Sequence, residues 1–340
     1  MYETDKKQET AVLIGVITKG QDEARSKEYL DELEFLAETA GAITKKRFVQ
    51  KLASPDKRTF VGSGKLEDIK AFIEFEEIDI AIFDDELSAS QLRNIEKVLD
   101  CKILDRTNLI LDIFAQRAQT SYARTQVALA QCQYLLPRLT KLWTHLDKQK
   151  GGIGLRGPGE TEIETDRRIV KDKINLLRKR LQEIDKQAFT QRKDRGEFIR
   201  VALVGYTNAG KSTLFNSLTG NKVYVEDQLF ATLDTTVRKL KLNKKHQVLL
   251  SDTVGFVRKL PHNLVASFKS TLKELLESDH ILIVLDASSI IINEHIDTIM
   301  EVLSELGADK ISKSFILNKI DLVDDESTIK NLKSEYNEGL

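Results

Sequence analysis

The sequence lacks the features that mark membrane, secreted and disulfide-rich proteins. No apolar run approaches the ~20 residues that a membrane-spanning helix needs, and the mixed polar residues 1–8 contain no signal-peptide core. The two cysteines, Cys101 and Cys132, do not form a metal-binding spacing, so we interpret them as reduced core thiols. With 41% hydrophobic and 31% charged residues among 340, the chain is expected to form roughly two or three soluble globular domains of a monomeric cytoplasmic protein.

A large excess of either charge is also absent, but the charges are unevenly distributed. The formal net charge is −1, yet residues 117–200 contain 19 lysines and arginines against 10 acidic residues. A basic middle between acidic parts favours a local contact with a polyanion over general nucleic-acid affinity. The alternative is a solvated helical face without a partner.

Residues 11–116 alternate strand-like and helix-like segments, which predicts a small parallel α/β domain over residues 1–116. The predicted strands span residues 11–18, 42–50, 78–83 and 101–104, and the predicted helices span residues 26–40, 65–76 and 88–99. The glycine-rich stretch Val61–Lys65 lacks the spacing of a phosphate-binding loop. A turn followed by a helix start is therefore favoured there over a second nucleotide site.

Residues 117–196 carry two apolar seams at helical spacing, which predicts a long helical hairpin. One seam lies within residues 132–146 and the other within residues 170–184. Pro137 falls inside the first seam, where we expect a kink or a break because proline disrupts the helical hydrogen bonds.

The predicted tip of this hairpin, residues 151–160, is rich in glycine. Glycine permits close approach of the backbone to a ligand surface, and Arg156 offers a forked donor for phosphate or a guanine edge. The tip is therefore interpreted as a probe for folded RNA. A plain flexible connector is the alternative.

The stretch Gly205–Thr213 follows an apolar strand and opens a helix, which is the order that a P-loop requires. Gly205 and Gly210 permit the tight turn that directs successive N–H groups at one anion. Lys211 is predicted to reach the outer phosphates, and the Ser212 hydroxyl is predicted to hold Mg²⁺. Residues 197–340 are thus predicted to form a P-loop domain. Its predicted strands span residues 198–205, 238–243, 247–252, 280–286 and 314–319, and its predicted helices span residues 211–219, 264–278 and 293–306.

The tetrapeptide Asn318–Asp321 closes the last predicted strand of this domain. The Asp321 carboxylate would accept hydrogen bonds from guanine N1–H and its exocyclic amine, which adenine cannot supply. Asn318 would contact the edge of the base or brace the P-loop, and the stem of Lys319 would cover the ring. The position of this motif after a P-loop indicates GTP rather than ATP.

Two further motifs predict a magnesium-dependent switch. Asp252 is expected to hold Mg²⁺ through a water, and the Gly255 N–H is expected to meet the γ-phosphate. One threonine of the segment Phe230–Thr236 should ligate Mg²⁺ only when the γ-phosphate is present. The spacing leaves Thr232, Thr235 and Thr236 open.

The residue after Gly255 is Phe256, where Ras-like enzymes place a glutamine that orients the attacking water. Because phenylalanine cannot hydrogen-bond water, slow intrinsic hydrolysis is predicted. A partner, another loop or K⁺ would supply the missing orientation, and Asn208 is a candidate ligand for K⁺.

These motifs resemble the HflX family of ribosome-associated GTPases over about residues 10–325. The resemblance rests on Gly205–Asn216, Asp227–Asp234, Asp252–Phe256, Leu260–His262, and Gly151–Glu160 followed by Glu164–Arg168. The glycine tip before the GTPase domain is the most specific part, since other P-loop GTPases lack it. The resemblance agrees with an α/β fold in which a small parallel α/β domain and a helical hairpin precede the P-loop GTPase domain.

Family membership implies hydrolysis of GTP to GDP and phosphate, stimulated by the ribosome and coupled to binding of the large (50S) subunit and its rRNA. Splitting, rescue or recycling of ribosomes would follow. The resemblance also selects Thr232 as the switch threonine and, with Ser212, as a Mg²⁺ ligand. The implied catalytic residues are Lys211, Thr232 and Gly255. The implied nucleotide-binding residues are Gly205, Asn208, Ala209, Gly210, Lys211, Ser212, Thr213, Phe230, Thr232, Asp252, Gly255, Asn318, Lys319 and Asp321. The implied ribosome contacts are Gly151, Gly152, Gly154, Arg156, Gly157 and Gly159.

The chain departs from the family pattern after Asp321. Residues 322–340 are largely polar and lack the Ser-Ala motif that usually backs the guanine base, so we expect the last strand and helix of the GTPase domain to be missing. Two other functions stay open: a GTP-dependent RNA-binding or ribosome-assembly factor without splitting activity, and a signalling switch that recognises a protein effector.

Overall fold

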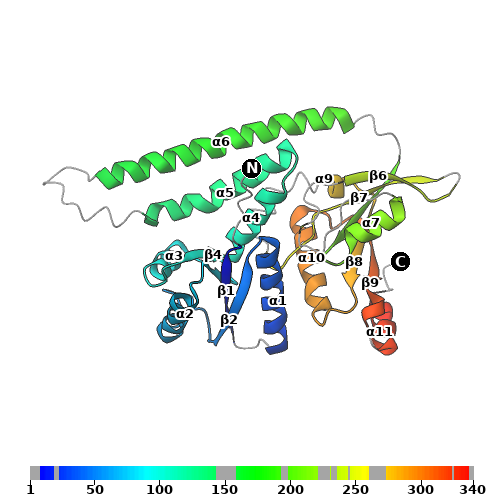
Figure 1. The fold of residues 1–340 in the computed structure, drawn as a ribbon. Coiled ribbons are helices and arrows are strands. Elements are labelled where there is room, and N and C mark those ends of the chain that lie inside the picture. Colours follow the sequence, from blue (N-terminus) through cyan, green and yellow to red (C-terminus); the bar gives the residue numbers. More distant parts are fainter. Residues whose placement is uncertain are drawn as a thin grey trace, which may run out of the picture. The chain divides into compact units, whose positions relative to one another are not determined.

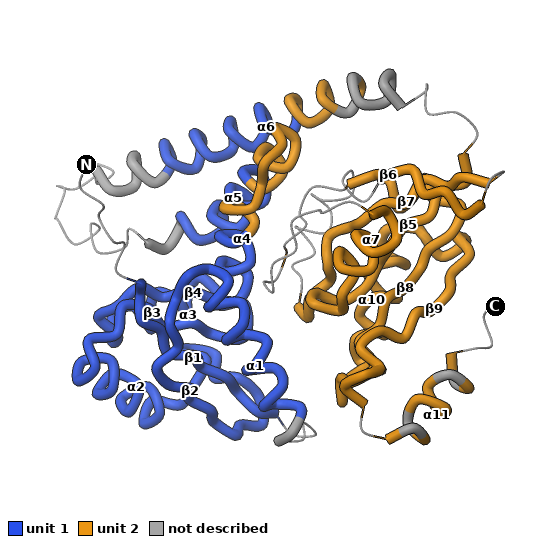
Figure 2. Tube along the Cα trace, turned by 45° about the vertical axis from the view of Figure 1, so that its right-hand side comes forward, with its two compact units in different colours: residues 1–113, 128–178 blue, residues 114–127, 179–340 orange. Residues whose placement is uncertain are grey.

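The computed structural model of the protein describes residues 8–18, 23–142, 158–192, 198–220, 230, 236–243, 246–259, 273–323 and 325–336. The chain divides into two compact units, shown in Figure 2. The first comprises residues 1–113 and 128–178, and the second comprises residues 114–127 and 179–340. None of the helices in the described ranges is both long and apolar enough to cross a membrane.

The first unit contains a four-stranded sheet in which every neighbouring pair is parallel. Its strands are β1 (Thr10–Ile17), β2 (Ile43–Lys51), β3 (Ile80–Phe83) and β4 (Lys102–Asp105), in the order β2-β1-β3-β4 (Figure 2). The associated helices are α1 (Glu23–Thr39), α2 (Ser63–Glu76) and α3 (Ala89–Glu96). Side chains from β1, β3 and α2 form one apolar core that includes Val12, Ile69 and Phe83. The predicted parallel α/β fold is confirmed.

Helix α4 (Arg106–Arg117) follows β4 directly and was not predicted. Its side chains Leu109, Ile110, Leu111 and Ile113 are all buried, so no exposed polar face marks the segment as a helix. Both cysteines are free thiols, Cys132 buried and Cys101 half-buried. Burial raises the pKa of Cys101 to about 11, which keeps this thiol protonated.

The middle of the chain forms two long helices, α5 (Ser121–Leu142) and α6 (Pro158–Arg192). The expected break at Pro137 is absent, because α5 continues through this residue. Within the same turn the Arg138 guanidinium donates to the Tyr134 carbonyl at 2.8 Å, next to the Gln133 carbonyl whose usual helical donor Pro137 lacks. Helix α6 begins at Pro158, inside the predicted glycine-rich tip, since proline is favoured at the first helical position.

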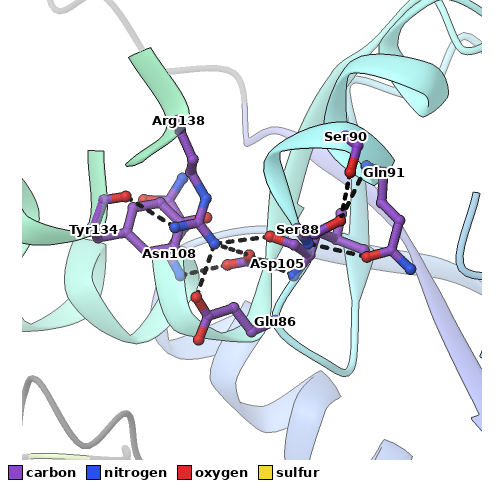
Figure 3. A network of polar contacts seen from close by, with 9 residues as sticks. Glu86, Ser88, Ser90, Gln91, Asp105, Asn108, Tyr134 and Arg138 are labelled. Carbon is purple, nitrogen blue, oxygen red and sulfur yellow. Dashed lines mark hydrogen bonds and ion pairs between the residues drawn. The ribbon is translucent and has the colours of Figure 1, made fainter. Parts of the chain in front are cut away.

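Arg138 is also the centre of a polar network at the carboxyl ends of β3 and β4 (Figure 3). Its guanidinium donates to Glu86 at 2.9 Å and to the Leu87 carbonyl at 2.8 Å, and it lies 3.5 Å from the Asp105 carboxylate. Asp105 also accepts from the backbone N–H of Asn108 at 2.8 Å and so caps α4. Burial raises the pKa of Asp105. The network fixes the carboxyl-terminal half of α5 to the first unit.

The second unit contains a five-stranded sheet in the order β6-β7-β5-β8-β9, with only β6 antiparallel among the described strands (Figure 1). The strands are β5 (Ile199–Gly205), β6 (Thr236–Lys241), β7 (Gln247–Asp252), β8 (His280–Asp286) and β9 (Ser312–Asn318). The helices are α7 (Lys211–Thr219), α9 (Lys273–Leu276) and α10 (Ile292–Leu306), followed by a short 3-10 helix, η2 (Ile320–Leu322). All five strands were predicted within a few residues. Of the predicted helix over residues 264–278, the described part contains only α9.

A helix that was not predicted follows Asp321. Residues Glu326–Tyr336 form helix α11. The Tyr336 ring lies 5.3 Å from that of Phe315 on β9, and its hydroxyl donates to Asn293 of α10. Leu332 is the one residue of α11 in the described core, so a few apolar contacts suffice to hold this polar helix.

Candidate functional site

The P-loop connects the end of β5 to the start of α7, and its glycines are required by close contacts. Gly210 has φ +90°, and a Cβ there would lie 2.2 Å from the Asn318 Nδ2 atom. A Cβ on Gly205 would lie 2.3 Å from the Val284 carbonyl oxygen of the neighbouring strand. Both distances are shorter than any contact between these atom types, so only glycine fits.

The predicted phosphate-binding lysine is buried beneath this loop. Lys211 Nζ donates to the carbonyl oxygens of Gly205 at 3.0 Å and Tyr206 at 2.7 Å. Burial lowers the pKa of Lys211 to about 8, partly opposed by the negative charge of Asp252. The loop carbonyls therefore hold the amine at the position from which a P-loop lysine meets phosphate oxygens.

Ser212 and Asp252, both predicted to hold Mg²⁺, lie in contact. The Ser212 hydroxyl donates to Asp252 Oδ2 at 2.7 Å, and the Asp252 side chain is fully buried at the end of β7. Hydroxyl and carboxylate oxygens are hard ligands that suit Mg²⁺, which usually takes one or two protein ligands beside substrate phosphates. Within the described ranges no cluster of three His, Cys, Asp or Glu residues could hold a metal on its own. The donor set therefore fits a metal shared with a nucleotide.

The segment after Asp252 lies directly on the P-loop. The Phe256 N–H donates to the Gly205 carbonyl at 3.1 Å, and the Thr207 N–H donates to the Phe256 carbonyl at 2.7 Å. A Cβ on Gly255 would lie 2.9 Å from Thr207 Cα and 3.0 Å from Lys211 Nζ. Gly255 is thus adjacent to the lysine amine, where a γ-phosphate contact is expected. The Phe256 side chain is 2% exposed and points into the core.

The predicted guanine motif lies at the end of β9. The Asn318 side-chain amide donates to the Ala209 carbonyl at 2.8 Å, which supports bracing of the P-loop, one of the two alternatives above. Lys319 adopts a left-handed conformation with φ +56° and forms an ion pair with Asp286 at 2.8 Å. Burial opposes the charge on Asp286, but the Lys319 and Ser288 hydrogen bonds lower its pKa. Asp321 lies on η2 and is exposed, which leaves its carboxylate accessible to a base.

The predicted switch segment is described at its ends only. Phe230 is buried, has φ +54°, and its ring contacts that of Phe114 edge-to-face at 4.6 Å. Thr236 begins β6. Thr232 and Thr235 lie outside the described residues, as do the tip residues Gly151, Gly152, Gly154, Arg156 and Gly157. Gly159 lies in the first turn of α6.

The structure therefore brings most of the predicted nucleotide-binding residues together around the ends of three strands. The P-loop residues Gly205, Asn208, Ala209, Gly210, Lys211, Ser212 and Thr213 are joined there by Asp252, Gly255, Asn318 and Lys319. Asn208 is exposed with φ +59°, so its side chain is accessible to a ligand.

Sequence reasoning missed three residues that contact this site. Phe114 packs against Phe230, and His295 of α10 stacks on the ring of Tyr206 with centroids 3.8 Å apart. The Tyr206 hydroxyl accepts a hydrogen bond from the Arg258 N–H. No local pattern identifies Phe114 or His295, because both contacts join residues distant in sequence.

Three segments of the chain match known protein families. Residues 27–115 match the family described as GTP-binding GTPase N-terminal, and residues 117–195 match GTP-binding GTPase Middle Region. Residues 200–319 match the family described as 50S ribosome-binding GTPase.

Similar proteins extend over nearly the whole chain. GTPase HflX of Flavobacterium psychrophilum is 58% identical over 92% of this chain and 76% of its own length. GTPase HflX of Escherichia coli is 44% identical over 93% of this chain and 74% of its own length. The crystal structure of SsGBP in complex with GDP is similar at a TM-score of 0.55 and 27% identity, covering 96% of this chain and 89% of that one.

Proposed function

The chain belongs to the HflX family of GTPases, and on that basis we propose that it binds the large ribosomal subunit in the cytoplasm and couples GTP binding and hydrolysis to ribosome splitting, rescue or recycling. We further propose three domains, at residues 1–116, 117–196 and 197–340. The first would be the N-terminal α/β domain, the second the helical hairpin with its glycine-rich tip, and the third the GTPase domain.

GTP is the proposed substrate of the P-loop site. The N–H groups between Gly205 and Thr213 would bind the phosphates, and Lys211 would stabilise negative charge that develops on them. Ser212 and Thr232 would hold Mg²⁺ directly and Asp252 would hold it through a water; the metal, when bound, neutralises phosphate charge. The exposed carboxylate of Asp321 would select guanine.

We propose that intrinsic hydrolysis is slow because the site lacks a side chain that orients water at position 256. Phe256 is buried and apolar, so it cannot act as a glutamine would. The ribosome would supply the missing orientation, and K⁺ held by the exposed Asn208 is a second source. Equal hydrolysis rates in potassium and sodium buffers would exclude the contribution of K⁺.

The observation that carries the ribosomal proposal is the charge on the surface of α6. Every lysine and arginine of α6 whose side chain is described is exposed: Arg167, Arg168, Lys171, Lys173, Arg178, Lys179, Arg180 and Lys186. Four acidic side chains of the helix are also described, Glu164, Asp166, Asp172 and Glu183, and the whole sequence of α6 holds nine basic against seven acidic residues. Such a basic helix fits the phosphate backbone of folded RNA. The glycine tip would extend this contact through Arg156.

The proposal is tested by sedimentation of the protein with 50S, 30S and 70S particles in the presence of GDP or a non-hydrolysable GTP analogue. We expect binding to 50S subunits that increases with the analogue, and conversion of 70S ribosomes to subunits. The double variant Arg167→Glu, Lys171→Glu should lose 50S binding and keep nucleotide affinity. The control double variant Lys97→Glu, Lys310→Glu changes the net charge by the same amount at exposed sites elsewhere, and it should bind 50S subunits as the wild type does.

The outcomes separate the candidate functions. Binding to 50S subunits without separation of 70S ribosomes would favour the RNA-binding or assembly factor over splitting. Equal loss of 50S binding in both double variants would mean that net charge, not α6, is responsible. Absence of wild-type binding to any ribosomal particle in any nucleotide state would refute the ribosomal proposal and favour a protein effector.

A further inference from the structure

Tyr206 connects the P-loop to the segment that follows Gly255. Its side chain is 6% exposed and lies between two other parts of the second unit. On one side its ring is nearly parallel to that of His295, with centroids 3.8 Å apart and an interplanar angle of 19°. At its end the hydroxyl accepts a hydrogen bond from the Arg258 backbone N–H at 2.6 Å.

The hydroxyl contact completes a set of bonds on one short segment. Two backbone hydrogen bonds join Phe256 to Gly205 and Thr207, and the Tyr206 hydroxyl then holds the N–H two residues further on. Gly255 immediately precedes this bonded stretch and lies beside Lys211 Nζ. The position of the Gly255 N–H relative to the P-loop therefore depends on how firmly residues 256–258 are held.

The surroundings of the tyrosine favour a fixed hydroxyl. A tyrosine has only two rotatable side-chain bonds, and stacking on the partly buried His295 restricts both. Burial lowers the pKa of His295 to about 4, opposed by the charges of Asp286 and Glu294, so the imidazole is neutral at pH 7. A neutral ring packs on the tyrosine without the cost of burying a charge.

We propose that Tyr206 is a positioning residue for GTP hydrolysis, which acts through the Arg258 N–H to hold Gly255 where it recognises the γ-phosphate. The proposal rests on the proposed role of Gly255 in γ-phosphate binding. A hydrogen-bond donor that is already held in place contributes more to ligand affinity, because it need not be ordered when the ligand binds. Tyr206 would thus favour GTP over GDP without touching either nucleotide.

The variant Tyr206→Phe tests this by removing only the hydroxyl and keeping the stacked ring. Affinities for GDP and for a non-hydrolysable GTP analogue are measured by calorimetry, with kcat and KM for GTP. Loss of one buried hydrogen bond should weaken analogue binding by about tenfold. GDP affinity should change by less than about twofold, and kcat should fall. The control Tyr336→Phe deletes a hydroxyl bonded to Asn293 in the same unit and should alter neither affinity.

Three outcomes would overturn the proposal. Equal loss of affinity for both nucleotides would make Tyr206 a structural residue of the P-loop. An unchanged ratio of the two affinities, in a variant whose melting temperature equals that of the wild type, would show that the hydroxyl does not position Gly255. The same loss of analogue affinity in Tyr336→Phe would show that the effect is not specific to the Tyr206 hydroxyl.

A separate variant tests whether Gly255 itself contacts the γ-phosphate. The variant Gly255→Ala adds a methyl group that would lie 2.8 Å from the Thr207 Cγ2 atom, which displaces the segment irrespective of Tyr206. If Gly255→Ala keeps the wild-type ratio of analogue to GDP affinity, the γ-phosphate contact itself is wrong. If the ratio of analogue to GDP affinity falls in Gly255→Ala but keeps its wild-type value in Tyr206→Phe, only the inference on Tyr206 fails.

Discussion

The substitution Gly210→Ala tests how the end of β9 supports the P-loop. Gly210 has φ +90°, and the new methyl carbon would lie 2.2 Å from Asn318 Nδ2. The left-handed conformation costs an alanine about 1–2 kcal/mol. Asn318 must also swing away and lose its hydrogen bond to the Ala209 carbonyl, which costs about 1 kcal/mol. We therefore expect a loss of about 2–3 kcal/mol in the free energy of unfolding.

The other end of α7 supplies the control. Gly220 has φ +67°, and a Cβ at this position would have no atom within 4 Å, so Gly220→Ala should cost only the conformational strain, about 1–2 kcal/mol. Asn318→Ala should cost about 1 kcal/mol. The double variant Gly210→Ala, Asn318→Ala should cost about 1 kcal/mol less than the sum of its single changes, because the hydrogen bond can be lost only once.

Urea unfolding of the four variants in nucleotide-free buffer measures these differences, and GDP titration measures the effect on the site. Gly210→Ala should bind GDP much more weakly than Gly220→Ala, since only the former displaces the loop. Equal unfolding free energies for Gly210→Ala and Gly220→Ala would refute the reasoning. Strict additivity in the double variant would show that Asn318 and Gly210 do not interact.

Three other predictions concern the base, pH and the first unit. Asp321→Asn should shift preference from guanine towards xanthine nucleotides, and unchanged GTP binding in competition assays would refute the base assignment. The pKa of His295 is lowered to about 4, so the unfolded chain binds more protons below pH 6.5. Stability should fall by about 3 kcal/mol between pH 6.5 and 4, and His295→Phe should remove that part of the slope in urea titrations. Arg138→Leu removes the cationic partner of the buried Asp105, which keeps its hydrogen bonds from the Leu87 and Asn108 N–H groups, and should cost about 3–5 kcal/mol in urea unfolding. A loss below about 1 kcal/mol would contradict the role of this network.

The P-loop was predictable because its chemistry is local. A strand, two glycines and a lysine within a few residues fix a phosphate site without knowledge of the rest of the fold. The bracing role of Asn318 was open, since the sequence does not show which of two partners its amide meets. The geometry favours bracing, through a hydrogen bond between residues 109 positions apart.

The elements that sequence reasoning missed lack a local signal. The middle of helix α4 is a short apolar run, Leu109–Phe114, interrupted only by Asp112, so its pattern does not distinguish a buried helix from a strand. Helix α11 has the opposite character and holds few apolar residues. Pro137 predicted a kink or a break, but α5 continues through it, with the Arg138 side chain bonded to the Tyr134 carbonyl in the same turn. For α4 and α11, tertiary contacts decide between conformations that the local residues leave close in energy.

The position of Phe256 supports the proposal that an external element is needed for fast hydrolysis. Its backbone is bonded on both sides to the P-loop, and its side chain is 2% exposed. A glutamine at this position would therefore place an amide in the core instead of beside the attacking water, at the cost of an unsatisfied polar group. Restoring the residue type of Ras-like enzymes would not restore their mechanism here. The bond from Phe256 to Gly205 keeps Gly255 against Lys211 but directs the next side chain away from the phosphate. This arrangement favours retention of GTP until another group orients the water.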